Sequence, residues 1–179
     1  FNSPLVFELV TARRRALSSG AEPSLGTANV NDMADMFSGA AAFNQTLDFD
    51  TSSTTSMSGM FAGALAFDQP LDFDTSSVIS MRAMFDGASA FNQPLSVSNA
   101  STARNSTRRR ALLSTGARGH FATSNVQDMG AMFRGAVAFN QPLRLATPSV
   151  TDMSGMFQGA LLFNSPLVFE LVTARRRAL

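Results

Sequence analysis

The sequence predicts an α/β repeat protein, a solenoid in which each coil of about 24 residues contributes one short parallel strand and one short helix. The motif Met-x-x-Met-Phe-x-Gly-Ala begins at Met33, Met57, Met81, Met129 and Met153, and these starts lie 24, 24, 48 and 24 residues apart. A Phe-Asn-Gln-Pro-Leu pentapeptide or a near variant follows each copy. Such a fixed period is typical of stacked repeats, because each unit buries its apolar face only against its neighbours.

Alternating apolar and acidic residues predict the strands. Leu71 and Phe73 alternate with Asp72 and Asp74, and a period of two places the apolar pair on one buried face. The same pattern recurs throughout the chain, usually after a Pro, which a strand tolerates at its first residue. We expect six parallel strands in one sheet, at residues 4–8, 46–50, 70–74, 94–98, 142–146 and 166–170.

The Met-Phe motif predicts the helices. Apolar residues in the third repeat fall at i, i+3, i+7 and i+10, the spacing of one helix face. These residues are Val78, Met81, Phe85 and Ala88. Helix-capping residues precede the motif copies, at Asn29, Ser53, Ser77, Asn125 and Ser149, and a Gly such as Gly87 follows where the helix ends. We expect five helices opposite the sheet, with the Met and Phe side chains in the core.

A short polar side chain follows the Phe that opens each turn. These residues are Asn2, Asn44, Asp68, Asn92, Asn140 and Asn164. Stacked in successive coils, they predict a ladder in which each side chain bonds the backbone of the neighbouring coil. The alternative is that each residue only starts a turn.

Two long insertions interrupt the repeats, at about residues 9–28 and 99–124. Both leave at the same corner of the coil, between a strand and the next helix, and a third begins at Leu171. Residues 1–17 recur letter for letter as residues 163–179. We therefore expect residues 1–179 to be a single solenoid segment of a longer array.

Opposite charges are segregated between the repeats and the insertions. The chain has 14 Arg and no Lys, and 11 of these Arg lie in the insertions, whereas 12 of the 13 acidic residues lie in the repeats. Each insertion contains the pentapeptide Arg-Arg-Arg-Ala-Leu. The small net charge of +1 therefore hides acidic repeats and basic loops.

The succession Phe-Asn-Gln-Pro-Leu, Thr-Ser-Ser-Val and Met-x-x-Met-Phe-x-Gly-Ala resembles the BspA-like leucine-rich-repeat surface proteins of bacteria and protists. The resemblance covers every repeat and leaves out only the insertions. It implies a leucine-rich-repeat-like solenoid with an exposed, adhesive or interaction role at the cell surface or outside the cell. No signal, anchor or membrane-spanning segment is visible in these residues.

Four carboxylates form the most conspicuous polar cluster of the predicted sheet. Asp48, Asp50, Asp72 and Asp74 would lie on neighbouring strands roughly 4.8 Å apart. Such oxygens could hold Ca²⁺, but only two coils show the pair, so a solvated acidic face is the better interpretation. With no Cys, one His and no nucleophile beside a base, we predict no enzyme, no catalytic residue, no cofactor and no metal.

The Arg triplets are the candidate basic sites. They are Arg13, Arg14 and Arg15 in the first insertion and Arg108, Arg109 and Arg110 in the second. Three interpretations stay open: solvated loops without a partner, a patch for anionic polymers, and a protease cleavage loop. We predict a non-enzymatic repeat protein in adhesion or protein–protein interaction, with a protein or glycan partner on the strand face. The alternative is an electrostatic binder of acidic glycan or nucleic acid through the Arg-rich loops.

Overall fold

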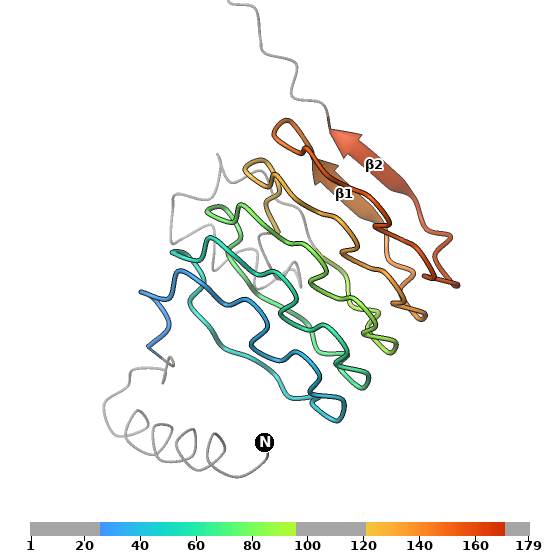
Figure 1. Ribbon diagram of the computed structural model, residues 1–179, viewed down its shortest axis with the longest axis horizontal. Helices are drawn as coiled ribbons and strands as arrows, with labels where there is room; N and C mark the ends of the chain where they lie inside the picture. Colours follow the sequence, from blue (N-terminus) through green and yellow to red (C-terminus); the bar gives the residue numbers. More distant parts are fainter. Residues whose placement is uncertain (1–25, 96–120, 171–179) are drawn as a thin grey trace, which may run out of the picture.

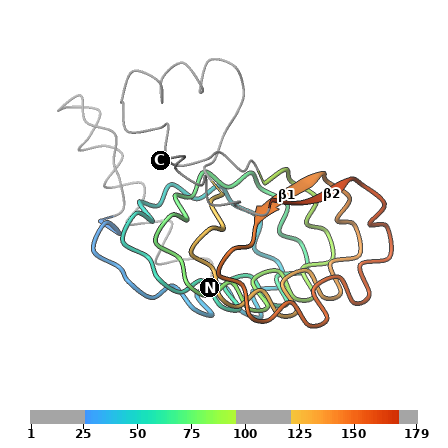
Figure 2. The same ribbon diagram turned by 90° about the horizontal axis from the view of Figure 1, so that it is seen from above.

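The computed structural model describes residues 26–95 and 121–170, in which the chain winds into flat coils that lie side by side (Figure 1). We number them coil 1 (26–50), coil 2 (51–74), coil 3 (75–95 with 121–122), coil 4 (123–146) and coil 5 (147–170). Each coil has a motif run, which carries Met-x-x-Met-Phe-x-Gly-Ala, and a return run, which carries the alternating apolar residues. Figure 2 shows the stack turned by 90°.

Two short strands lie at the end of the stack. β1 (Leu143–Ala146) and β2 (Leu167–Glu170) pair in parallel, with Leu143 opposite Leu167 and Ala146 opposite Glu170. They correspond to the last two of the six predicted strands, and the prediction of a longer sheet is wrong for the described residues. Residues 46–50 and 70–74 form no strand, residues 94–95 form none either, and residues 4–8 and 96–98 lie outside the described part.

The return runs of coils 1 and 2 lie together through side chains. Phe49 and Phe73 stack with ring centroids 6.3 Å apart, but no backbone hydrogen bond joins residues 46–50 to residues 70–74. The alternation of apolar and polar residues therefore reports which side chains face the core. It does not by itself show that a backbone ladder forms.

The predicted helix in each coil is wrong, because the described residues contain no helix. In the motif run of coil 2, alternate N–H groups donate to carbonyls of coil 3. These bonds are Met57 to Ser80 (3.0 Å), Gly59 to Arg82 (2.8 Å), Phe61 to Met84 (2.9 Å) and Gly63 to Asp86 (2.7 Å). Between these donors, the N–H groups of Met60 and Ala62 donate to carbonyls three residues back, at 3.2 Å to Met57 and 2.9 Å to Gly59. An α-helix would direct every N–H to the carbonyl four residues back, so the predicted α/β solenoid is replaced by stacked turns.

A left-handed residue at two places in the motif run produces this alternation. Ala83 has φ 53° and Gly87 has φ 68°, and equivalent residues in the other coils share the sign. Each left-handed residue reverses the curl of the chain, so the run advances without becoming a helix. The three- and four-residue spacing of the apolar residues is the repeat of these turns.

The core between the two runs is a set of stacked rings and Met side chains. One column consists of Phe37, Phe61, Phe85, Phe133 and Phe157, with centroids 5.4–5.6 Å apart between coils. A second consists of Phe43, Phe67, Phe91, Phe139 and Phe163, at 5.8–6.0 Å. The predicted core is confirmed in coil 3, where Val78, Met81, Phe85 and Ala88 are 0% exposed.

The predicted side-chain ladder at the turns is also confirmed. The N–H of Asp68 donates to Asn44 Oδ1 at 3.0 Å, and that of Asn92 donates to Asp68 Oδ1 at 2.9 Å. The ladder continues through Asn140 to Asn164. Because turn N–H groups would otherwise lack partners, this column gives every coil the same register as its neighbour.

Coils 3 and 4 touch directly, although their motifs lie 48 residues apart in the sequence. The N–H of Met81 donates to the carbonyl of Asp128 at 2.9 Å, and Phe91 stacks on Phe139 at 6.0 Å. Phe121, which we assigned to the second loop, is 2% exposed and belongs to the core. The carbonyl of Ala122 accepts from the Thr75 hydroxyl as that of Asp74 accepts from Thr51, so the chain rejoins the stack at Phe121, before the predicted end of the insertion at residue 124.

We expect Ala83→Gly to stabilise the protein, because it removes left-handed strain of about 1–2 kcal/mol at a loss of only about 0.5–1 kcal/mol from added freedom in the unfolded chain. Gly87→Ala should destabilise it by about 1–2 kcal/mol for the same reason. Urea unfolding of both variants measures the difference. The control is Ala62→Gly, which lies in an equivalent run without a positive φ and should lose about 0.5–1 kcal/mol. Destabilisation by Ala83→Gly equal to that of the control would contradict the assigned backbone.

Phe85→Ala should reduce the free energy of unfolding by about 3–5 kcal/mol, because the ring is fully buried between two neighbouring coils. Phe37→Ala, at the equivalent position of coil 1, should lose roughly half as much, since that ring stacks on one neighbouring coil only among the described residues. Equal losses from both variants in denaturant unfolding would show that stacking on the second neighbour adds nothing.

Candidate interaction surface

Buried polar side chains of the stack serve its own backbone. Thr51, Thr75 and Thr123, the first residues of coils 2, 3 and 4, each donate a hydroxyl hydrogen to the carbonyl of the last residue of the same coil, at 2.8–3.0 Å. No buried side-chain nitrogen or oxygen of the described residues lacks a hydrogen-bond partner. These buried hydroxyls therefore close each coil, and candidate sites must be sought on the outer faces.

The predicted helix caps take part in the same bonding between coils. The Ser77 hydroxyl donates to the carbonyl of Ser52 at 2.9 Å, and Asn125 Nδ2 donates to the carbonyl of Ser76 at 2.7 Å. Their assignment as helix caps is wrong, because no helix follows them. The same donors instead bond carbonyls of the coil before them.

The four predicted carboxylates lie at the outer side of the return runs in coils 1 and 2. Asp48, Asp50 and Asp72 are exposed, and Asp74 is half-buried. Asp50 Oδ1 accepts from the N–H of Ser52 at 3.1 Å and from its hydroxyl at 2.6 Å, while Asp74 Oδ1 accepts from the N–H of Ser76 at 3.0 Å. The structure thus places all four on adjacent coils, two of them closing the corner turn. We call these residues the acidic face.

Metal binding finds no support on this face. Among residues 26–95 and 121–170, no group of three or more His, Cys, Asp or Glu side chains could hold a metal ion. A search of the same residues for a helix that could span a membrane finds none.

The predicted basic sites, Arg13 to Arg15 and Arg108 to Arg110, lie outside the described residues, as do residues 175–177.

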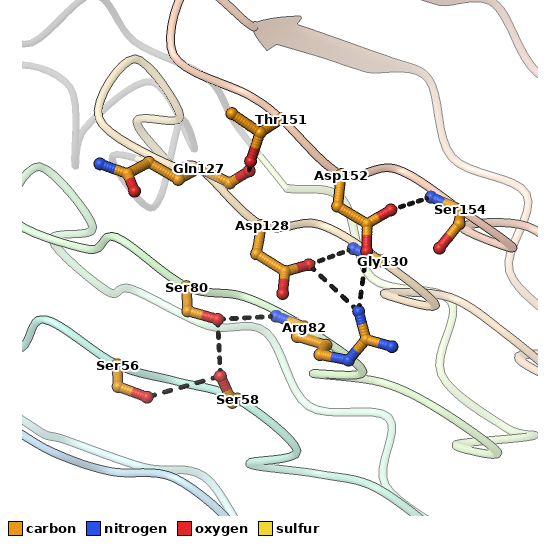
Figure 3. Close-up of polar contacts among 10 residues, drawn as sticks. All are labelled: Ser56, Ser58, Ser80, Arg82, Gln127, Asp128, Gly130, Thr151, Asp152 and Ser154. Carbon is orange, nitrogen blue, oxygen red and sulfur yellow. Dashed lines mark hydrogen bonds and ion pairs between the residues drawn. The ribbon is translucent and has the colours of Figure 1, made fainter.

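A second polar surface lies on the motif runs, and our sequence reasoning missed it (Figure 3). Arg82 of coil 3 reaches across coil 4 to coil 5: its Nη1 lies 2.9 Å from Asp152 Oδ2 and 3.5 Å from Asp128 Oδ1. Gly130 makes this reach possible, because a Cβ there would lie 2.6 Å from Arg82 Nη1. Arg82 and Gly130 both hold the second position of the Met-x-x-Met-Phe-x-Gly-Ala motif, in consecutive copies of it. A long charged side chain in one copy and a glycine in the next was the signal in the sequence that could have indicated this contact.

Other charged pairs also join neighbouring coils. The guanidinium of Arg134 forms two hydrogen bonds with the carboxylate of Asp86, one of them from Nε to Oδ1 at 2.9 Å. Arg144 Nη1 lies 3.8 Å from Glu170 Oε1 across β1 and β2. The three Arg of the described repeats therefore each face a carboxylate from another coil.

Hydrogen bonds shift the pKa values of two of these groups. Asp152 has its pKa lowered chiefly by hydrogen bonds from the backbone and side chain of Ser154, with a smaller effect of Arg82. The hydrogen bonds and charge of Asp86 raise the pKa of Arg134. Both shifts favour the charged forms, so this surface is built from ionised groups.

Comparison with known proteins gives one family. A family profile described as "Mycoplasma protein of unknown function, DUF285" matches residues 18–115 and 112–172. No curated protein and no solved structure matches the chain.

We expect the pKa of Asp152 to lie below the ordinary value of about 3.9. Because the folded pKa is below the unfolded one, the carboxylate stabilises the fold above about pH 4, and this contribution is lost as the pH falls through the folded pKa. An NMR titration of the side-chain carboxyl measures it. Arg82→Gln should raise this pKa by only a minor part of the total shift, because Ser154 supplies the main hydrogen bonds. A pKa at or above 3.9 in the intact protein would contradict this geometry.

Proposed function

The chain belongs to the family described as "Mycoplasma protein of unknown function, DUF285", and we propose that it is a non-enzymatic interaction module of a cell-surface or secreted protein. Its partner is a protein with a basic segment, which binds the acidic face of coils 1 and 2. The observation that carries this proposal is the placement of Asp48, Asp50, Asp72 and Asp74 on adjacent coils at the outer side of the return runs.

The spacing of these carboxylates suits an extended basic peptide. Asp48 and Asp50 lie two residues apart along one run, which corresponds to about 6.6 Å in an extended chain. Their equivalents Asp72 and Asp74 lie on the next coil, whose Phe73 stacks on Phe49 with ring centroids 6.3 Å apart. An Arg guanidinium of an extended partner can form two hydrogen bonds to one carboxylate. The side chain two residues further along the partner points the same way and can reach the next carboxylate.

The stack holds this face in a fixed shape before a partner arrives. The Thr51 hydroxyl donates to the carbonyl of Asp74 within coil 2, and Phe49 of coil 1 stacks on Phe73 of coil 2. Asp50 and Asp74 each accept a hydrogen bond that closes a turn. A preorganised face loses little conformational freedom on binding, so more of the contact energy becomes affinity.

A non-enzymatic role is consistent with how the polar residues are used. The buried polar side chains of the described residues are Thr51, Thr54, Thr75 and Thr123, and the hydroxyl of each donates to a backbone carbonyl of the stack. The charged residues of the described ranges lie exposed or half-buried, where water competes for each of them. A catalytic site usually relies on groups withdrawn from water and held with shifted pKa values near neutrality.

Display at the cell surface is proposed from the motifs. Phe-Asn-Gln-Pro-Leu and Met-x-x-Met-Phe-x-Gly-Ala resemble those of the BspA-like surface proteins, and the family match covers most of the residues that carry them. The finer assignment to adhesion rests on that resemblance.

The acidic face is tested with a fluorescein-labelled nona-arginine peptide, whose binding is followed by fluorescence anisotropy at low salt. Asp48→Asn/Asp72→Asn should weaken binding roughly fivefold, because two exposed charge pairs of about 0.5 kcal/mol each are lost. The matched control is Asp32→Asn/Asp35→Asn, which removes the same charge from the motif run of coil 1 and should change the affinity by less than about twofold.

The alternative function is tested in the same assay with a long sulfated glycan. If the Arg-rich loops carried binding, replacing Arg108, Arg109 and Arg110 with Ser would abolish glycan binding with a steep salt dependence. Unchanged peptide binding by the Asp48→Asn/Asp72→Asn variant, together with loss of glycan binding by the Arg variant, would overturn the proposed function in favour of this alternative.

A further inference from the structure

The two ends of the described stack carry complementary backbone groups. In coil 4, alternate N–H groups of the motif run donate to carbonyls of coil 5. These bonds run from Met129 to Asp152, Ala131 to Ser154, Phe133 to Met156 and Gly135 to Gln158, all at 2.8 Å. In coil 5 the equivalent donors are Met153, Gly155, Phe157 and Gly159, and their N–H groups have no acceptor among the described residues. One end therefore presents a row of four donors.

The opposite end presents the matching acceptors. In coil 2, the carbonyls of Ser56, Ser58, Met60 and Ala62 accept N–H groups from coil 1. Their equivalents in coil 1 are the carbonyls of Asp32, Ala34, Met36 and Ser38, which accept no hydrogen bond from the described residues. Both rows repeat with the same two-residue spacing, so donors and acceptors match in position.

The side-chain ladder has the same polarity along the stack. Each side chain accepts from the coil that follows it, as Asn140 Oδ1 does from the N–H of Asn164 at 2.8 Å. At the end of the ladder, Asn164 Oδ1 accepts no hydrogen bond from the described residues. At its start, the N–H of Asn44 donates to no described residue. This contact also joins coil 5 to coil 1, and it would not join two copies of the same end.

Core side chains are uncovered at both ends. Met36 is 42% exposed, whereas its equivalents Met60 and Met84 are 0% exposed because another coil precedes them. Phe157 and Phe163 are half-buried, although Phe133 and Phe139 in the same columns are fully buried. Leu162 is 60% exposed at the coil 5 end. An additional coil would therefore find apolar surface at either end.

The sequence indicates which coil fits. Residues 163–170, the return run of coil 5, have the same sequence as residues 1–8, which precede coil 1 along the chain. The run that precedes coil 1 in this chain and the run that closes coil 5 are thus chemically the same. A second copy of this chain presents to coil 1 the sequence that already precedes it.

We propose that coil 5 of one copy docks on coil 1 of a second copy, head to tail. Four N–H groups at Met153, Gly155, Phe157 and Gly159 donate to the second copy's row of carbonyls, and both Phe columns continue across the junction. The contact uses different surfaces on the two copies, so it propagates into an open filament unless the rotation closes a ring. The proposal is independent of the acidic face, which lies on the return runs and stays accessible.

The test uses the whole 179-residue chain in analytical ultracentrifugation over a range of concentrations. The wild-type mass should rise in steps of 19.0 kDa. Leu162→Glu blocks the coil 5 end and Met36→Glu blocks the coil 1 end, so each variant alone should stay monomeric. An equimolar mixture should form a dimer and nothing larger, because each variant keeps the end that the other one needs.

Leu65→Glu is the matched control, because Leu65 is 51% exposed on the side of coil 2 and should leave association unchanged. Circular dichroism establishes that every variant keeps the wild-type spectrum, and a variant that does not is replaced by Leu162→Gln or Met36→Gln. A wild-type chain that stays monomeric at every concentration would overturn the proposal. Dimers of Met36→Glu alone would also overturn it in favour of symmetric pairing.

Discussion

Hydrogen bonds between coils, made by alternate N–H groups of the motif runs, are the interaction on which the rest of this structure depends. Gly59, Phe61 and Gly63 direct their N–H groups out of their own coil, so none of them is available to a helix. The remaining N–H groups close short turns within the run. Since neither set alone would hold an isolated run of eight residues, each coil depends on a neighbouring coil for its stability.

This pairing explains why so many side chains repeat in columns. Coils held at a constant spacing bring identical positions into contact, and Phe61 lies 5.6 Å from Phe85 because the backbone has already set the register. Side chains at equivalent positions also bond the backbone. At a buried position the Thr75 hydroxyl donates to the carbonyl of Ala122, and at a turn Asn92 Oδ1 accepts from the N–H of Asn140. The residues that differ between coils therefore lie mainly on the outer faces of the stack. There the Arg82 contacts with Asp128 and Asp152 and the acidic face differ from coil to coil.

The outer faces and the ends of the stack offer different kinds of binding. The acidic face is polar and is formed by side chains on adjacent coils, so it suits a partner recognised by charge. The ends expose backbone groups and core side chains such as Met36 and Phe157, which suit another coil of the same kind. A stack can therefore lengthen through its ends and bind a partner on its side without competition between the two.

The sequence by itself determined the period, the core and the polar ladder. Met81 and Phe85 recur at a fixed interval and had to face neighbours, and Asn92 recurred where a turn N–H needed a partner. Local spacing could not decide between a helix and a series of turns, because both bring an apolar side chain inward every three or four residues. Only the tertiary structure decided it, since the alternate N–H groups bond better to the neighbouring coil than within a run too short for a stable helix. The Arg82 contacts and the place of Phe121 were likewise decided by stacking, which brings together residues that lie 46 to 70 positions apart in the chain.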